Sequence, residues 1–202
     1  MGLHDFTVYG FIQRNAFLYP DRAAVVFNNT RITHKEYKEK CDRLASGLKQ
    51  AGVCSGDRIG VLSHNCHEMM LLYGAAAKIG AIVLPVNWRF KQDEIEYVLN
   101  DCTPKIVFAG QEYSSMVSEA ACRVSSIEKC YYIGSGEIPK GFSPFEQLYL
   151  EYEPSATPNV TADSGFVIIH TAAVGGKPRG ALLSQSNIVF SNLLMMQQYG
   201  LS

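Results

Sequence analysis

One short stretch of the chain combines a hydroxyl, several glycines and two cations, which is a set of groups that could bind an anion. Its candidate binding residues are Thr171, Gly175, Gly176, Lys177, Arg179 and Gly180. Glycines let successive backbone N–H groups converge and let a ligand approach closely. Lysine and arginine supply charge for phosphate oxygens. The pattern is therefore that of an anion-binding loop.

Two interpretations of this stretch remain open at this point. In one it binds phosphate, and in the other it is a surface hairpin whose two cations are only solvated. The local sequence by itself favours the hairpin. A Walker A loop is excluded, because Lys177 is followed by Pro178, whereas that motif requires Ser or Thr there.

Regular elements flank the loop and must position it. The apolar run Phe166–Ile169 is typical of a strand buried on both faces. Residues 181–183 resume an extended pattern. Ser184 or Ser186 can then cap a helix with apolar residues on it. The loop would thus lie between two anchored segments.

The preceding part of the chain alternates helical and extended patterns. Helices are expected over 6–18, from the capping box at 33–36 to Gly52, and over 68–78, 93–99 and 113–124. Strands are expected over 23–27, 31–33, 59–62, 81–85, 105–109 and 129–133, with a tight turn at Asn28-Asn29. Strand–helix–strand units with short connections predict an α/β fold, in which helices flank a mostly parallel sheet.

Three segments are expected within this single part of a domain. Residues 1–133 form an α/β subdomain. Residues 134–163 contain four prolines and form a connecting loop with a short helix near 145–150. Residues 164–202 comprise the strand before the glycine-rich loop, the loop itself and the following helix.

Composition excludes some classes of protein. The chain has 202 residues, of which 47% are hydrophobic and 18% charged, and its formal net charge is −1. Without a basic run, nucleic acid is not an expected partner, and no apolar run is long enough to cross a membrane. The N-terminus lacks the pattern of a signal peptide. Six scattered cysteines without a Cys-x-x-Cys pair are then expected to be reduced and mostly buried, which favours a cytoplasmic location.

Other residues have side chains with potential chemistry, and each also has a structural interpretation. His64 and His67 have a spacing that metal sites use, but no second ligand pair is visible, and turn or packing roles are favoured. Arg89 follows a strand end, where open α/β sheets bind ligands, so it is a possible ligand contact; a structural salt bridge is the alternative. The methionine pairs Met69-Met70 and Met195-Met196 are expected in the core rather than in a cofactor site.

The loop resembles the phosphate-loop signature of the AMP-forming acyl-CoA synthetases, a family of adenylate-forming ligases. That signature reads Tyr/Phe-Thr-Ser-Gly-Thr/Ser-Thr-Gly-x-Pro-Lys-Gly. Thr171, Gly176, Pro178 and Gly180 match it, and Arg179 stands at the position of its lysine. Upstream, the run from 52 to 59 is similar to the family's Gly-Val-x-x-Gly-Asp-x-Val, and the resemblance continues along nearly the whole chain.

The loop also departs from the signature. Ala172, Ala173 and Val174 stand where the family has Ser, Gly and Thr/Ser, Gly175 replaces Thr, and His170 replaces the aromatic residue. Of the family's phosphate-binding hydroxyls, Thr171 remains. Each missing hydrogen bond to a charged phosphate would be worth about 1.5–3 kcal/mol, so weaker phosphate binding is expected.

The resemblance implies an activity for the whole enzyme. A carboxylic acid substrate would react with ATP and Mg²⁺ to give an acyl adenylate, and the acyl group would then pass to CoA. The six loop residues would bind the nucleotide phosphates. The resemblance also implies that these 202 residues are the first part of the large domain, that the C-terminal half and lid domain lie outside them, and that no catalytic residue lies within them.

The same resemblance leaves a rival open. The chain alone is expected to have no ligase activity, and the rival is a catalytically inactive family member, or an isolated domain that binds a nucleotide or a partner. A cut through the large domain would leave apolar edges exposed, so self-association into a homo-oligomer is also expected.

Overall fold

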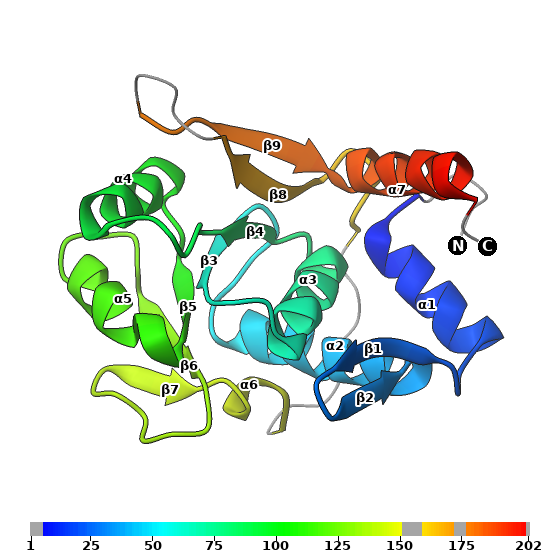
Figure 1. Cartoon of the computed structure of the whole chain (residues 1–202), viewed down its shortest axis with the longest axis horizontal. Coiled ribbons are helices and arrows are strands. Elements are labelled where there is room, and N and C mark those ends of the chain that lie inside the picture. Colours follow the sequence, from blue (N-terminus) through cyan, green and yellow to red (C-terminus); the bar gives the residue numbers. More distant parts are fainter. Residues whose placement is uncertain (1–5, 151–158, 172–176, 201–202) are drawn as a thin grey trace.

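The computed structural model describes residues 6–150, 159–171 and 177–200 (Figure 1). The elements are α1 (Val8–Leu18), β1 (Ala23–Phe27), β2 (Thr30–Thr33), α2 (His34–Gln50), β3 (Arg58–Leu62), α3 (His67–Ile79), β4 (Ile82–Pro85), α4 (Gln92–Cys102), β5 (Ile106–Gly110), η1 (Gln111–Tyr113), α5 (Ser114–Ala121), β6 (Lys129–Ile133), β7 (Phe142–Pro144), α6 (Gln147–Leu150), β8 (Gly165–His170), β9 (Gly180–Ser184) and α7 (Gln185–Tyr199).

The main sheet has seven strands in the order β7-β6-β5-β3-β4-β8-β9. Neighbouring strands run parallel, except that β8 and β9 form an antiparallel pair. A separate two-stranded sheet pairs β1 with β2 in antiparallel fashion. The predicted α/β fold, with a mostly parallel sheet flanked by helices, is confirmed.

The central strands are buried on both faces. Along β5, Ile106 and Phe108 face the core formed with α2 and α3. Val107 and Ala109 point the other way, into the core formed with α4 and α5. Because side chains alternate along a strand, an uninterrupted apolar run places one half of its residues in each core. Figure 1 shows these helices on the two sides of the sheet.

Local sequence signals produced the expected boundaries. The capping box that opens α2 is present, with Thr33 Oγ1 accepting from the Glu36 backbone N–H and the Glu36 carboxylate accepting from the Thr33 N–H. Gly80 ends α3 in the left-handed conformation, with φ of 74°. Asn28 adopts φ of 51° in the turn between β1 and β2. These positions need only neighbouring residues to define them.

A buried charge network joins the first three helices. The Asp42 carboxylate of α2 accepts from Lys38 at 2.6 Å, from Lys78 of α3 at 2.9 Å and from the Tyr9 hydroxyl of α1. Burial alone would raise the pKa of Asp42, but the hydrogen bonds from Lys38, Tyr9 and Lys78 outweigh it and hold that pKa below its ordinary value. The network fixes α1 against the α2–α3 pair.

The strand β7 was not predicted from the sequence. The segment 134–163 was expected to be a connecting loop with one short helix, and α6 is that helix, but β7 also forms there. Phe142 pairs with Cys130 and Pro144 with Tyr132, in parallel with β6. Proline is tolerated because β7 lies at the edge of the sheet, where no further strand needs its missing N–H.

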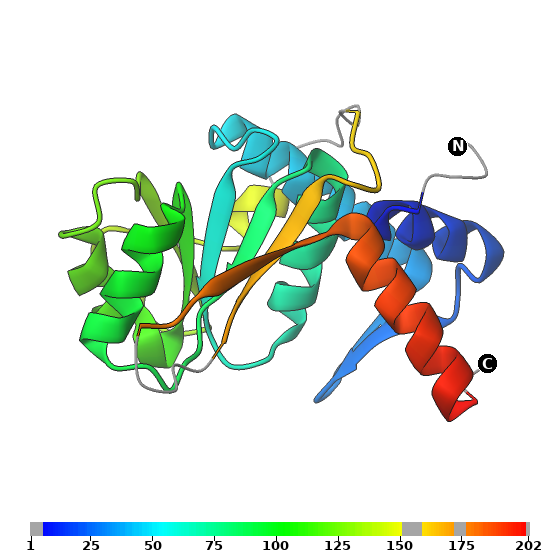
Figure 2. The ribbon, with the colours of Figure 1, turned by 90° about the horizontal axis from the view of Figure 1, so that it is seen from above.

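The strand before the glycine-rich loop is only partly buried, which corrects the expectation that both of its faces are covered. Phe166 and Val167 are buried, but Ile169 is 41% exposed. Within the described residues, β8 joins β4 through a single residue pair, Val83 with Val167. Beyond that pair β9 is the sheet neighbour of β8 among the described residues, and the hairpin extends to the end of α4, against which Ile168 and His170 still pack (Figure 2).

The last helix is capped as predicted but is not a core helix. Ser184 is its N-cap, and its hydroxyl accepts from the Asn187 N–H at 3.2 Å. The expectation that Met195 and Met196 are in the core is wrong, because both are about half exposed. Within the described residues α7 packs mainly on α1 and β9, so most of its apolar side chains meet no second layer. The expected self-association stays a prediction.

The described helices also bear on membrane insertion. Within residues 6–150, 159–171 and 177–200, no helix combines the length and the apolar character needed to cross a membrane.

Candidate functional site

The glycine-rich loop connects the two strands of an antiparallel hairpin. Beyond the last strand pair, His170 with Gly180, the Thr171 N–H donates to the Arg179 carbonyl at 3.1 Å. The Thr171 hydroxyl donates to the same carbonyl at 3.4 Å. The structure therefore brings Thr171 and Arg179 together at the base of the loop. The hairpin interpretation describes the backbone correctly, and it leaves phosphate binding open.

The centre of the loop lies outside the described residues. It comprises two of the proposed phosphate-binding positions, Gly175 and Gly176, together with the three positions at which the loop departs most from the signature, Ala172, Ala173 and Val174.

The two cations of the loop are exposed. Lys177 Nζ lies 4.8 Å from the centroid of the Tyr97 ring on α4. Arg179 is also exposed. Within the described part of the chain, neither cation forms an ion pair with a carboxylate. Both charges are therefore available for an anionic ligand.

Gly180 has a packing reason in addition to any role in ligand approach. A Cβ at this position would lie 2.8 Å from Ile168 Cγ2 and 3.1 Å from the His170 ring. These side chains come from β8, directly across the hairpin. Glycine is therefore needed for β9 to pair closely with β8 at the point where the loop begins.

Arg89 lies after the carboxyl end of β4, as expected. Its guanidinium carbon lies 4.6 Å above the Trp88 ring, and Trp88 in turn lies 4.6 Å from the His64 ring. The His64 Nε2 and the Tyr113 hydroxyl form a hydrogen bond of 2.9 Å. Among the described residues, Arg89 forms no salt bridge, which was the alternative role considered for it. Within the same residues, it also makes no hydrogen bond or ring contact with the β8–β9 hairpin.

A polar pocket lies where the strand order reverses. The chain passes from β3 to β4 on one side and then returns to place β5 on the other side of β3. The residues that follow β3, β5 and β6 line a pocket of about 640 Å³, and they include Ser63, His64, Gln111, Gly134 and Ser135. Open α/β sheets bind ligands at such a reversal. The sequence favoured a turn or packing role for His64 but did not reveal that three strand ends meet beside it.

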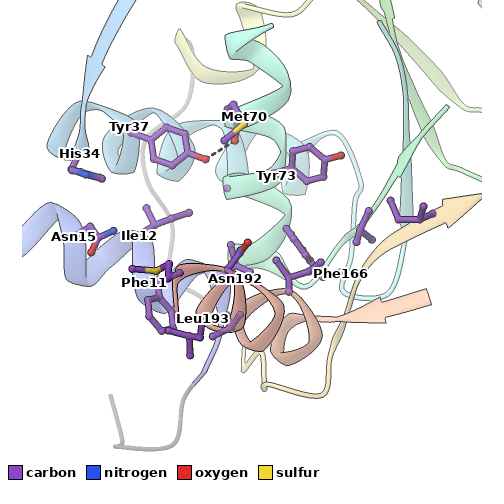
Figure 3. Close-up of a pocket in the computed structure, with 17 residues that line it drawn as sticks. Phe11, Ile12, Asn15, His34, Tyr37, Met70, Tyr73, Phe166, Asn192 and Leu193 are labelled. Carbon is purple, nitrogen blue, oxygen red and sulfur yellow. Dashed lines mark hydrogen bonds between the residues drawn. The ribbon is translucent and has the colours of Figure 1, made fainter. Parts of the chain in front are cut away.

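A second pocket, of about 600 Å³, is mainly apolar (Figure 3). It lies among α1, α3, β8 and α7, and Phe166 and Ile169 of β8 line it. The Tyr37 hydroxyl at its edge donates to the Met70 carbonyl at 2.6 Å. Its described lining includes no lysine or arginine, so it offers no cation for phosphate. Sequence reasoning missed this pocket, because it depends on helices far apart in the chain.

All six cysteines lie in the described part of the chain, and each is free. Cys41, Cys102 and Cys130 are buried, Cys66 is half-buried, and Cys54 and Cys122 are exposed. The expectation that the cysteines are mostly buried therefore does not hold for Cys54 and Cys122.

Comparison with known proteins places these features in a family. Residues 12–201 match the family described as AMP-binding enzyme. The indoleacetate–CoA ligase of Aromatoleum aromaticum is 28% identical over 195 residues, which are 95% of this chain and 38% of that protein. The crystal structure of a protein named as a long-chain-fatty-acid CoA ligase, from Rhodopseudomonas palustris, is 44% identical with a TM-score of 0.91. The match covers 100% of this chain and 50% of that one.

A more distant structure shares the fold. The anthranilate CoA ligase AuaEII, solved in complex with anthranoyl-AMP, superimposes with a TM-score of 0.85 at 19% identity, over 92% of this chain and 36% of that chain. The chain thus spans half or less of the length of these relatives. Because the family match extends over nearly all of its residues and includes the glycine-rich hairpin, the chain belongs to the AMP-binding enzyme family.

Proposed function

We propose that this chain is the N-terminal part of an ATP-dependent, AMP-forming acyl-CoA ligase. The observation that carries the proposal is the β8–β9 hairpin, which presents the exposed cations Lys177 and Arg179 and the hydroxyl of Thr171 at one loop, in a chain of the AMP-binding enzyme family. The 44% identity over the whole chain to a protein named as a fatty-acid CoA ligase supports it.

The proposed reaction has two steps. A carboxylate oxygen of the acid attacks the α-phosphorus of Mg-ATP, and the bond to the pyrophosphate leaving group breaks. The CoA thiolate then attacks the acyl carbon of the adenylate, and AMP leaves. Lys177 and Arg179 bind the β- and γ-phosphates and neutralise the charge that grows on the departing pyrophosphate. Thr171 donates its hydroxyl, and Gly175, Gly176 and Gly180 let the loop close around the phosphates.

Magnitudes favour moving Lys177 to the nucleotide. Its contact with the Tyr97 ring is exposed, and such cation–π contacts are worth about 0.5–1 kcal/mol. A hydrogen bond to a charged phosphate is worth about 1.5–3 kcal/mol. Lys177 therefore gains by leaving Tyr97 when a polyphosphate binds. Thr171 can turn its hydroxyl to phosphate while its backbone N–H keeps the bond to Arg179.

The proposal extends to organisation and location. Residues 1–133 are the α/β subdomain, 134–163 the connection and 164–202 the phosphate-binding segment of the large domain. We propose a carboxylic acid as the substrate without naming which one, because the relatives' names refer to acids as different as indoleacetate, anthranilate and long-chain fatty acids. A cytoplasmic location would keep the six free thiols reduced. A homo-oligomer remains a prediction.

Pyrophosphate exchange tests the proposal directly. The full-length protein that contains this chain is given Mg-ATP, labelled pyrophosphate and a panel of aromatic and fatty acids. With its acid, the enzyme should transfer label into ATP. Lys177→Ala and Arg179→Ala should each lower exchange at least about tenfold, since each removes a bond to a charged phosphate. Lys140→Ala removes an exposed cation far along the chain from the loop and should leave exchange unchanged.

The second candidate is an inactive member that keeps nucleotide or partner binding. The residues that favour it are Ala172, Ala173 and Val174, which replace residues of the signature. The triple variant that restores Ser, Gly and Thr at these positions should raise exchange if weak phosphate binding limits the reaction. If neither the natural nor the restored protein exchanges label with any acid, while calorimetry shows Mg-ATP binding, the binding module is correct and the ligase proposal fails.

A further inference from the structure

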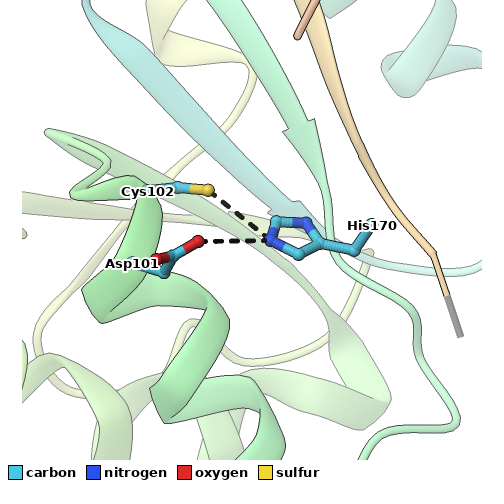
Figure 4. Close-up of side chains that lie close together, drawn as sticks. All are labelled: Asp101, Cys102 and His170. Atoms are coloured by element: carbon cyan, nitrogen blue, oxygen red, sulfur yellow. Dashed lines mark hydrogen bonds and ion pairs between the residues drawn. The ribbon is translucent and has the colours of Figure 1, made fainter. Parts of the chain in front are cut away.

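Three side chains with metal-binding atoms meet where α4 ends and β8 ends (Figure 4). Cys102 Sγ lies 3.7 Å from His170 Nε2, and Asp101 Oδ2 lies 3.8 Å from the same nitrogen. All three atoms lie within 4.8 Å of one another. Residues 101 and 102 are separated from His170 by almost seventy positions, so the fold alone brings them together.

The chemistry and spacing of these atoms fit one particular class of ion. Thiolate, imidazole and carboxylate together are ligands of Zn²⁺ and similar thiophilic divalent cations. In a tetrahedral zinc site with ordinary bond lengths, sulfur and nitrogen are about 3.6 Å apart and nitrogen and oxygen about 3.3 Å apart. Cys102 and His170 already have this spacing, and Asp101 Oδ2 lies about half an ångström farther from His170 Nε2 than such a site requires. The Asp101 side chain is half exposed and can therefore move closer.

A second observation points to an incomplete site at His170. The ring is only 4% exposed, and its Nε2, the nitrogen that faces the cluster, has as contacts a thiol at 3.7 Å and a carboxylate at 3.8 Å, both longer than a strong hydrogen bond. Buried polar groups in native proteins are nearly always satisfied, by protein, water or an ion. An ion at Nε2 would satisfy that nitrogen; Nδ1 has no partner among the described residues and would lie outside the metal's coordination.

We propose that Asp101, Cys102 and His170 form a binding site for Zn²⁺ or a similar thiophilic divalent cation, with water as the fourth ligand. On binding, the Cys102 thiol releases its proton to solvent as the sulfur–metal bond forms. The imidazole lone pair of Nε2 and one carboxylate oxygen complete the protein ligands, while the oxidation state of the metal does not change. The inference does not depend on the proposed ligase activity.

The surroundings of the site impose two opposing electrostatic effects. Burial and the Asp101 carboxylate raise the pKa of the Cys102 thiol to about 11, although the nearby Arg58 charge lowers it. The Arg58 guanidinium donates to the Cys102 carbonyl at 2.8 Å and to the Thr103 carbonyl at 3.0 Å. It therefore fixes the end of α4 in place, which preorganises Asp101 and Cys102 in the absence of a metal.

The site would act on the loop through its position. His170 is the residue directly before Thr171, and Lys177 on the other side of the loop contacts Tyr97 of the same helix. Both ends of the loop therefore meet α4. A metal bound between α4 and His170 would fix one of these ends, and so restrict the positions available to Thr171.

Cobalt substitution tests the site without any need for activity. Tag-free chain is titrated with Co²⁺ under reducing conditions, and thiolate-to-cobalt absorption is followed in the near ultraviolet. One equivalent should produce the absorption, and Zn²⁺ should displace the cobalt. Cys102→Ser should abolish the absorption. Asp101→Asn, at a half-exposed helix end, should weaken Zn²⁺ binding at least about tenfold, because losing a ligand costs more than losing an outer-shell partner.

Matched controls distinguish the site from other thiols. Cys54→Ser and Cys122→Ser remove exposed cysteines and should keep the absorption. His170→Gln should lose it, and circular dichroism checks that this variant is folded; Asp101→Asn carries the test if it is not. The proposal is wrong if the natural chain gives no thiolate-to-cobalt absorption, or if Cys102→Ser keeps it.

Discussion

The centre of the sheet and the β8–β9–α7 segment are both rich in apolar residues, but they differ in how much of that surface is covered. In β3, β4 and β5 almost every side chain is buried, because α2 and α3 cover one face and α4 and α5 the other. In β9 and α7, Leu182, Phe190 and Leu194 are each more than half exposed. The two regions differ in their number of layers, and much less in their composition.

The two regions are expected to contribute differently, one mainly to stability and the other to ligand binding. Burial of apolar area is the main favourable term in folding, so the centre of the sheet supplies most of the free energy of unfolding. The hairpin supplies little by comparison, and it carries the cations that we propose bind phosphate. Regions that must adapt to a ligand are commonly the ones with few buried contacts.

The largest expected contrast comes from one substitution made in both regions. Phe108→Ala in β5 removes a ring that is fully buried and should lower the free energy of unfolding by about 3–5 kcal/mol. Phe190→Ala in α7 removes a ring that is 51% exposed, and the change should stay within about 1 kcal/mol. Urea unfolding of both variants measures the contrast. Equal losses would show that α7 is part of the main core.

A second contrast concerns buried and exposed charge. Asp42→Asn leaves Lys78 buried beside a neutral partner and should cost about 3 kcal/mol at neutral pH. The folded pKa of Asp42 is depressed, so its contribution is present above its ordinary pKa and is lost as the pH falls through the folded value. Below about pH 4, the natural chain should therefore lose stability more steeply than Asp42→Asn.

Thermal or urea unfolding between pH 2 and pH 7 provides this measurement, with Lys177→Ala as the control. That variant removes an exposed cation of the hairpin and should change stability by less than about 1 kcal/mol at every pH. Parallel pH profiles for the natural chain and Asp42→Asn would contradict the assignment of a paired carboxylate.

The smallest contrast compares two helix caps with the same geometry. Thr33 caps α2 and Ser184 caps α7, each accepting from the backbone N–H three residues later at 3.2 Å. Thr33→Ala should cost about 1 kcal/mol of global stability. Ser184→Ala should cost less in global unfolding and should instead speed amide hydrogen exchange within α7, because that helix opens locally. Equal global losses would show that both helices unfold together.

Features that depend on neighbouring residues could be predicted from the sequence. The capping box at Thr33 and the turn at Asn28 each require a few consecutive residues, and both formed as expected. The buried strands of the centre were also predicted, since a short apolar run between short connections is typical of a buried strand in an α/β fold. The resemblance to the adenylate-forming ligases was confirmed by the family match.

Features that depend on distant partners could not be predicted in the same way. The three residues of β7 become a strand only because β6 lies beside them. Ile169 belongs to an apolar run but is exposed, because it lies on the opposite face of β8 from Ile168 and His170, which pack toward α4. The cluster of Asp101, Cys102 and His170 has no sequence motif, since two of its members end a helix and the third ends a strand. The loop residues 172–176 lie outside the described residues, so their proposed role rests on resemblance.

The register of β8 with β4 consists of one residue pair, Val83 with Val167, so a small rotation about that pair would move the loop of the hairpin much farther. Thr171 lies four residues beyond Val167, a distance of about 13 Å along an extended strand at about 3.3 Å per residue. A rotation of about 10° at that pair would therefore carry Thr171 through about 2 Å, which is comparable to the difference between a hydrogen bond and none. Contacts between the far end of the hairpin and α4 act at the longest distance from this pivot, so even weak ones exert a large torque on its orientation.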